Sequence, residues 1–285
     1  MWFILSLISA ISVSLSDFLA KVYMKDLNPK DTALVRFITS SIFIIPLLPF
    51  KIDEISKLNH TIYLYLILLI PLEIVAFILY SQAIRIAHIS LVMPITAFSP
   101  LLVAITSMII LGEYPSLLGL TGILLIAVGS FMIFKTRGVR EESNLKGIIY
   151  MSIATVIYAF TTTISKECVI IANPFTFALL YYPLISTAMA IPVVILYNKE
   201  QIRDLLKKTI NRESLLCGFF LAVSIITHFL AISLTKASYM IAVKRTSLLF
   251  SVIMGHYLLK ESEFKNRLAG SILMILGLLF ISMAK

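Results

Sequence analysis

Two adjacent cations, Lys244 and Arg245, stand inside the apolar run from Ala237 to Leu259. Each such charge costs roughly 2.5 to 3.5 kcal/mol at the centre of a membrane-spanning helix, so the pair requires a partner or a function. A guanidinium offers a planar fork to a carboxylate or phosphate, and an ammonium acts as a point charge. We therefore expect the pair to bind a dianionic or phosphorylated group of a substrate.

The residues around this pair predict a small, polar helix face. Ser247 and Ser251 follow Lys244 at spacings that place all three on one face, whereas Arg245 lies about 100° round the helix. We expect Lys244 and the two serines to face a water-filled cavity, with Arg245 at its edge. His228, in the preceding apolar segment, is either a substrate ligand or a hydrogen-bonded packing histidine.

Two carboxylates are also placed within apolar segments, Asp17 in the first and Glu73 near the middle of the third. A carboxylate at such a depth must be protonated or paired. Glu73 is therefore either a counter-charge for the two cations or a proton-coupling group. Asp17 has the spacing to pair with Lys21, and it also suits the lining of a cavity. A structural ion pair between these carboxylates and the two cations is the alternative to an anion site.

The composition predicts an all-α integral membrane protein. Hydrophobic residues make up 59% of the 285 positions and charged residues 14%, against roughly 25% charged in a soluble domain. The mean hydropathy is +0.99. We expect ten transmembrane helices, because each of ten apolar segments can cross a hydrocarbon core about 30 Å thick. They are residues 2–20, 33–50, 61–84, 89–111, 115–134, 145–165, 174–197, 214–235, 237–259 and 266–284.

The formal charge of +9 resides mainly in the connections 21–32, 135–146 and 198–213. With ten spans these three fall on one side, so the positive-inside rule favours both termini outside the cell membrane. Loop charge of this kind gives no reason to expect a nucleic-acid partner. Segment 201–210 alternates apolar and charged residues and predicts a short helix on the cytoplasmic surface.

A repeat divides the chain into residues 1–138 and 139–285. Matched pairs at a shift of 148 include Ser90 and Ser238, Ser99 and Ser247, Glu113 and Glu261, Gly122 and Gly270, and Gly129 and Gly277. At a shift of 145 they include Lys21 with Lys166 and Pro29 with Pro174. Five spans in each half force the halves to cross the membrane in opposite directions, as in inverted-repeat transporters with a site at the midplane.

Special residues within the repeat predict how the helices pack and break. The glycine pairs seven residues apart in the fifth and tenth segments predict close backbone packing. Pro94 and Pro100 each remove one hydrogen bond from the fourth segment. Thr96, between them, is the repeat equivalent of Lys244, so we expect it at the substrate site, although a simple kink without ligand contact is the alternative.

The stretch from Tyr80 to Ile84, followed by Ala87, Ser90, Pro94, Pro100, Leu111-Gly112-Glu113, Gly122 and Gly129, resembles the EamA-type module of the drug/metabolite transporter superfamily. The second half repeats the pattern. The resemblance implies ten helices around a central cavity, and it implies cytoplasmic termini, opposite to the loop charges. Tyr80, within the pattern, is a further expected substrate-binding residue. The pair Lys244-Arg245 also resembles the lysine-arginine pair with which plastid sugar-phosphate translocators bind phosphate.

The sequence thus predicts a secondary active transporter that moves a small organic solute by alternating access, with an anionic group bound at the two cations. The alternative is a proton-coupled exporter of amino acids or other neutral or zwitterionic solutes, and a lipid-handling membrane protein is a further one. The motifs of Walker loops, zinc proteases and serine hydrolases are absent, and two cysteines offer no metal spacing. We expect no enzyme activity and no cofactor. The expected partners are the substrate, protons or a counter-transported solute, and the lipid bilayer, with the chain as monomer or homodimer.

Overall fold

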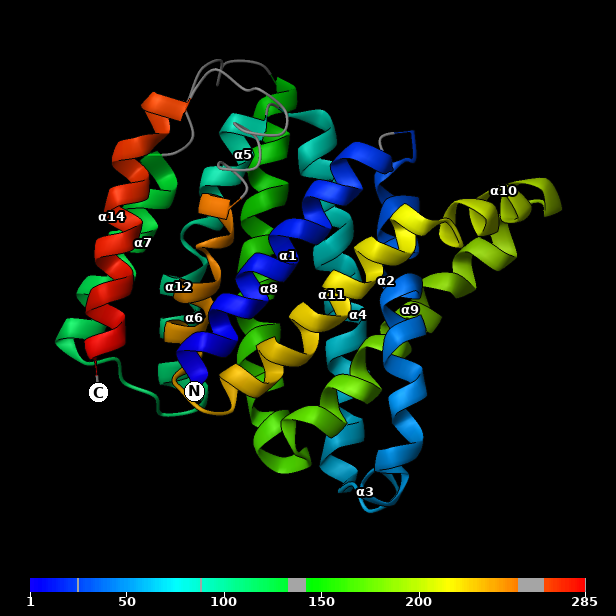
Figure 1. Cartoon of the computed structure of the whole chain (residues 1–285), viewed down its shortest axis with the longest axis horizontal. Helices are drawn as coiled ribbons and strands as arrows, with labels where there is room; N and C mark the ends of the chain where they lie inside the picture. Colours follow the sequence, from blue (N-terminus) through cyan, green and yellow to red (C-terminus); the bar gives the residue numbers. More distant parts are fainter. Residues whose placement is uncertain (25, 88, 133–141, 251–263, 285) are drawn as a thin grey trace.

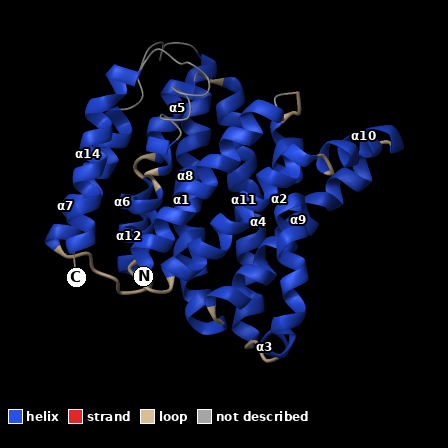
Figure 2. Ribbon diagram, viewed as in Figure 1, coloured by secondary structure: helices blue, strands red, loops and turns tan. Residues whose placement is uncertain are grey.

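The computed structural model describes residues 1–24, 26–87, 89–132, 142–250 and 264–284, and within these ranges the chain is helical with no strand (Figures 1 and 2). Both termini lie at one end of the bundle, and α10 projects near the opposite end (Figure 1). The helices are α1 (Trp2–Tyr23), α2 (Pro29–Ile44), the 3-10 helix η1 (Ile45–Lys51), α3 (Ile52–Ser56), α4 (His60–Ile86), α5 (Ile89–Thr96), α6 (Ser99–Ile110), α7 (Leu117–Met132), α8 (Glu142–Ala172), α9 (Pro174–Leu196), α10 (Lys199–Thr209), α11 (Arg212–Ile232), α12 (Ala237–Lys244) and α14 (Phe264–Met283).

Seven segments are long and apolar enough to cross a membrane, which confirms the membrane class of the chain. They are Trp2–Ala20, Lys30–Ser56, His60–Ile84, Val92–Ile110, Asn144–Ala172, Pro174–Leu196 and Arg212–Ile232. Two more apolar helices, Leu117–Met132 and Ala269–Met283, are shorter. The expected total of ten transmembrane helices stays a prediction.

Asparagine begins five of these helices. The side chains of Asn28, Asn59, Asn173, Asn198 and Asn211 each accept a hydrogen bond from a backbone N–H of the first turn. Such caps satisfy donors that the helix itself leaves free. At α10 the cap is reciprocal, because the Gln201 side chain accepts from the Asn198 backbone N–H at 3.0 Å. The predicted short helix over 201–210 is therefore confirmed as α10.

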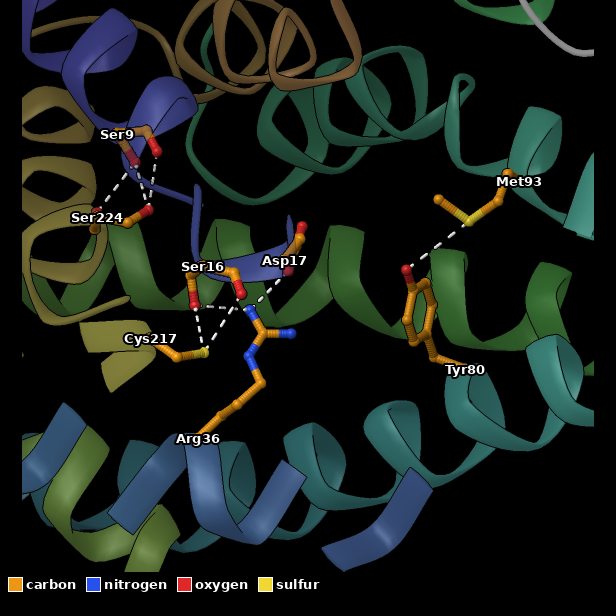
Figure 3. Close-up of polar contacts among 8 residues, drawn as sticks. All are labelled: Ser9, Ser16, Asp17, Arg36, Tyr80, Met93, Cys217 and Ser224. Carbon is orange, nitrogen blue, oxygen red and sulfur yellow. Dashed lines mark hydrogen bonds and ion pairs between the residues drawn. The ribbon is translucent and has the colours of Figure 1, made fainter. Parts of the chain in front are cut away.

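Three long helix pairs form the bundle: α1 packs along α11, α4 along α8, and α7 along α14. Small polar residues join the first pair, where Ser9 Oγ donates to the Ser224 backbone oxygen at 2.9 Å (Figure 3). The third pair is joined by glycines. A Cβ on Gly122 would lie 2.8 Å from the Gly277 oxygen, and one on Gly129 would lie 2.5 Å from the Gly270 oxygen. The close packing predicted for these four glycines is confirmed.

Two membrane helices are interrupted at matching positions. The proline-containing fourth segment ends α5 at Thr96 and resumes as α6 at Ser99, with 3-10 turns between them. The ninth segment is also interrupted: α12 ends at Lys244, Arg245 and Thr246 form a turn, and residues 247–250 are helical again. The expectation of one unbroken helix from residue 237 onward is wrong at this turn, because the backbone there tightens to i+3 hydrogen bonds.

The loop after α6 is tied to the other half of the chain by Glu113. Its carboxylate pairs with Lys166 of α8 and accepts the backbone N–H of Ala237 at 2.9 Å, at the start of α12. Lys166 also donates to the Thr235 backbone oxygen. A carboxylate at a helix N-terminus is favourable, because the helix dipole is positive there. The basic partner of Glu113 is thus Lys166, whereas Glu261, its match at a shift of 148, lies outside the described residues.

Candidate functional site

A cavity of about 320 Å³ lies in the middle of the bundle. Residues of α1, α2, α4, α6, α8, α9, α11 and α12 line it, together with the turn after α12. Among the described residues, its charged lining consists of three cations and two carboxylates, namely Arg36, Lys244, Arg245, Asp17 and Glu73. The two cations found from the sequence therefore do face a cavity, and both expected carboxylates face it with them.

Lys244 occupies the last position of α12 and points to α11. Its Nζ lies 3.2 Å from Nδ1 of His228. An ammonium has only donors, so His228 accepts at Nδ1, and its ring proton resides on Nε2. The ring of His228 packs edge-on to Phe229, with centroids 5.0 Å apart. His228 thus orients Lys244 within the cavity wall without neutralising its charge.

Arg245 stands in the turn that interrupts the helix. Its Nε donates to Ser99 Oγ at 2.7 Å, which holds the guanidinium against the first residue of α6. Within the described part of the chain, its terminal nitrogens have no hydrogen-bond partner and it forms no ion pair. Among the described residues, the fork of Arg245 is therefore held at Nε while its terminal donors stay free, which is the arrangement that binds an anion.

Arg36, on α2, is the third cation of the cavity and already has a partner. Its Nη2 donates to Asp17 Oδ1 at 2.6 Å and to Ser16 Oγ at 3.1 Å (Figure 3). Asp17 is therefore engaged by Arg36, and it forms no ion pair with Lys244 or Arg245 among the described residues. The side chain of Lys21, the partner considered for Asp17 from the sequence, lies outside the described part.

Glu73, on α4, lies in a part of the cavity that is rich in hydroxyl groups. Thr161 and Tyr181 line the cavity together with it. Tyr181 is buried, and its hydroxyl has no hydrogen-bond partner among the described residues. Tyr158 and Tyr182 lie nearby and line the same cavity. In the described ranges Glu73 forms no ion pair, and Lys244 is the cation whose charge acts on it.

The sequence of the chain matches a known protein family. The sequence model of the EamA-like transporter family matches residues 1–135 and 145–283. The chain belongs to the EamA-like transporter family. Its members are multi-pass membrane transporters of small solutes and not enzymes, so a solute cavity in the middle of the bundle is in keeping with the family.

Solved structures share the fold of this EamA-like chain, and 28 chains match it. One of them, described only as "Crystal structure of protein", has a TM-score of 0.77 and 12% sequence identity, over 98% of this chain and 95% of that one. At this identity the likeness shows the fold alone. No curated protein matches the chain by sequence.

The cavity of this EamA-like protein collects most of the residues that the sequence singled out. Six of the nine line it: Lys244, Arg245, Ser247, His228, Glu73 and Asp17. Thr96 and Tyr80 are not among its lining residues. The Thr96 hydroxyl donates to the Met93 backbone oxygen at 2.8 Å, within its own helix. The Tyr80 hydroxyl meets Met93 Sδ at 3.7 Å (Figure 3). Ser251 lies outside the described residues.

The polar residues of α8 fall into two groups, one that lines the cavity and one that bonds α6. Thr161, Thr162 and Ser165 line the cavity. Thr163 instead bonds the Thr106 hydroxyl of α6 at 2.7 Å. In the described ranges, no group of three metal-ligating side chains occurs. The described lining residues thus offer charged side chains and hydroxyl groups to a solute.

Proposed function

We propose that this protein is a secondary active transporter of a small organic anion, carboxylated or phosphorylated, which binds at Lys244 and Arg245. The observation that carries the proposal is the distribution of ion pairs in the cavity. Arg36 is neutralised by Asp17, whereas Lys244 and Arg245 form no ion pair within the described residues. Fixed cations without counter-charges in a partly desolvated cavity attract an anion more strongly than they would in water.

The net charge of the cavity supports the same conclusion. Three cations and two carboxylates of the described residues line it, so one positive charge of this set is left over when all are ionised. An excess charge within a membrane protein is costly, and an anionic solute removes it. Arg245 adds the planar donor geometry that carboxylates and phosphates accept in pairs of hydrogen bonds.

Alternating access between two inverted halves, residues 1–138 and 139–285, is supported by helix contacts and cavity residues that correspond between the halves. Under the repeat α1 corresponds to α8 and α11 to α4, so the packing of α1 on α11 corresponds to that of α8 on α4. Repeat-related residues also line the cavity together: Asp17 with Thr162, Arg36 with Tyr181, Phe37 with Tyr182, and Ser99 with Ser247. A site shared by equivalent positions of two halves is what rocking of one half against the other requires.

The two ends of the bundle differ, as expected for a transporter whose cavity is closed at one end and open at the other. Near the termini, the buried pair of Glu113 and Lys166 joins the halves. Towards the opposite end, Asp17 lines the cavity and its side chain is 53% exposed. We infer that the cavity opens on the side of α10 and the basic loops, which loop charge would place in the cytoplasm.

A second candidate is export of zwitterionic solutes such as amino acids. It is favoured by Glu73, which lines the same cavity as Arg245 and would accept the ammonium group while Arg245 holds the carboxylate. In that case neutral zwitterions bind better than anions of similar size.

The test is a thermal-stabilisation screen of the purified chain, because a ligand of the folded state raises its melting temperature. The panel is sulfate, inorganic phosphate, glycerol 3-phosphate and succinate, with glycerol as the neutral control and glutamine as the zwitterion. We expect the anions to stabilise the protein, and we expect Lys244→Gln and Arg245→Gln to lose that effect while Lys207→Gln, on the surface of α10, keeps it. Stabilisation by glutamine alone would favour the second candidate, and equal stabilisation of all variants would rule out the anion site.

A further inference from the structure

Glu73 has a place in the transport cycle that follows from the charges around it. With Asp17 engaged by Arg36, it is the one carboxylate among the described lining residues left to balance Lys244 and Arg245. A substrate anion needs the same two cations. Glu73 and the substrate therefore compete for one pair of positive charges within a cavity of about 320 Å³.

The outcome of this competition depends on the charge of the substrate. The pair with an ionised Glu73 carries one excess positive charge, so a monoanion neutralises the cavity. A dianion leaves one excess negative charge unless a carboxylate takes up a proton. Like charges confined in a medium of low dielectric repel strongly, so one of them is expected to accept a proton.

The surroundings of Glu73 suit both protonation states. Thr161 and Tyr181 line the cavity together with it, and the Tyr181 hydroxyl has no hydrogen-bond partner among the described residues. A hydroxyl donates to a carboxylate and accepts from a carboxylic acid, so either form is accommodated without a large rearrangement. The titratable and charged cavity groups around it are Tyr158 of α8, Tyr181 and Tyr182 of α9, Arg36 of α2, Asp17 of α1, His228 of α11, Lys244 of α12, and Arg245 directly after α12.

We infer that Glu73 is a proton-binding site of the cycle, ionised while Lys244 and Arg245 are vacant and protonated when a dianionic substrate occupies them, so that the anion and one proton cross together. This inference rests on the proposed anion site. The carboxylate takes the proton from water in the open cavity, no covalent bond to the substrate forms, and the proton leaves to water on the far side when the anion dissociates. Protons would then be the coupling ion.

The test measures sulfate binding to the purified full chain by calorimetry at a series of pH values. Sulfate suits it because the anion stays doubly charged across the range. We expect the dissociation constant of the wild type to rise by about tenfold per pH unit above the titration of Glu73, because binding then requires one proton. In Glu73→Gln, which mimics the protonated acid, we expect tight binding that does not depend on pH.

His228 could imitate this behaviour, because a second cation beside Lys244 would also favour sulfate at low pH, and so could Lys244, because loss of its proton at high pH would weaken sulfate binding. We expect His228→Gln to keep the slope of the wild type. A slope that is kept in Glu73→Gln would overturn the inference.

A measurement on the wild type alone keeps the inference testable if a variant does not fold. Sulfate binding is measured in two buffers of different ionisation enthalpy, and the difference in heat gives the number of protons taken up. We expect about one proton per sulfate. Binding without proton uptake that is lost in Lys244→Gln would overturn the role of Glu73 and leave the anion site intact, whereas no sulfate binding at all would contradict both.

Discussion

The Nε of Arg245 donates a 2.7 Å hydrogen bond to Oγ of Ser99, and this bond joins the two turns that interrupt the membrane helices. Ser99 is the first residue of α6, directly after the break between α5 and α6. Arg245 lies in the equivalent break after α12. Interrupted helices place backbone groups at a transport site, so the bond fixes the guanidinium where both halves of the chain meet the cavity.

Ser99→Ala removes this support and leaves Arg245 free to move. A hydrogen bond to a charged group contributes about 1.5 to 3 kcal/mol, so we expect anion binding to weaken by about tenfold or more. The matched control is Ser152→Ala, since the Ser152 hydroxyl donates to the Ile148 backbone oxygen of its own helix at 2.8 Å and Ser152 is not among the described lining residues of the cavity. Calorimetric titration with sulfate compares the two, and equal affinities would show that the bond does not position Arg245.

The ion pair of Glu113 and Lys166 is mostly buried, with side-chain exposures of 19% and 5%. Removing one partner leaves the other without compensation, so we expect Lys166→Met to lower the stability of the protein by about 3 to 5 kcal/mol. The double variant Glu113→Gln with Lys166→Met should recover part of this loss. The control is the exposed pair of Asp204 and Lys208 in α10, where Lys208→Met should lower the stability of the protein by less than about 1 kcal/mol.

Melting temperatures in detergent provide the comparison between the two pairs. If Lys166→Met were no more damaging than Lys208→Met, the buried pair would not hold the two halves together at this end of the bundle.

The glycine contact between α7 and α14 predicts sensitivity to a single methyl group. In Gly129→Ala the added Cβ would lie 2.5 Å from the Gly270 oxygen, so the helices must separate, at a cost of about 1 to 3 kcal/mol. Val128→Ala, on the exposed face of the same helix, should change stability by less than about 0.5 kcal/mol. Thermal unfolding of both variants tests this, and an unchanged melting temperature for Gly129→Ala would mean that the two backbones are not in contact.

Orientation in the membrane is predicted by the loop charges. Lys207 of α10 and Tyr114, in the loop after α6, are both exposed, whereas the native Cys168 and Cys217 are buried. We expect a membrane-impermeant thiol reagent applied to intact cells to label Tyr114→Cys and to spare Lys207→Cys. The opposite labelling would place the termini in the cytoplasm, as the resemblance to EamA-type modules implies.

Much of the site was predictable because charge is costly in a membrane helix. That argument identified Lys244, Arg245, Glu73 and Asp17, all of which line the cavity. The same argument applies to Arg36, which lies in the second apolar segment. Its partnership with Asp17 could not be predicted, because the pair joins two helices whose relative rotation the sequence does not reveal.

The cavity tyrosines and the second helix break are features that the sequence does not predict directly. Tyr158 and Tyr181 carry no charge, so in an apolar helix nothing in the sequence separates them from lipid-facing or packing residues. Pro94 and Pro100 predict the first break, whereas no proline or glycine lies at the second break at Arg245. A shift of 148 residues maps the first break onto it, which is the one signal available. The repeat also placed Thr96 opposite Lys244, but its hydroxyl is satisfied within its own helix.

The central claim is that Lys244 and Arg245 bind the anion that the protein carries. Its most direct test is uptake into liposomes that contain the purified protein, with the radiolabelled anion that stabilises it best in the screen. We expect saturable uptake by the wild type and by Lys207→Gln, and uptake reduced to the level of empty liposomes in Lys244→Gln and Arg245→Gln, although both variants remain folded. Unchanged uptake kinetics in these two variants would contradict the account.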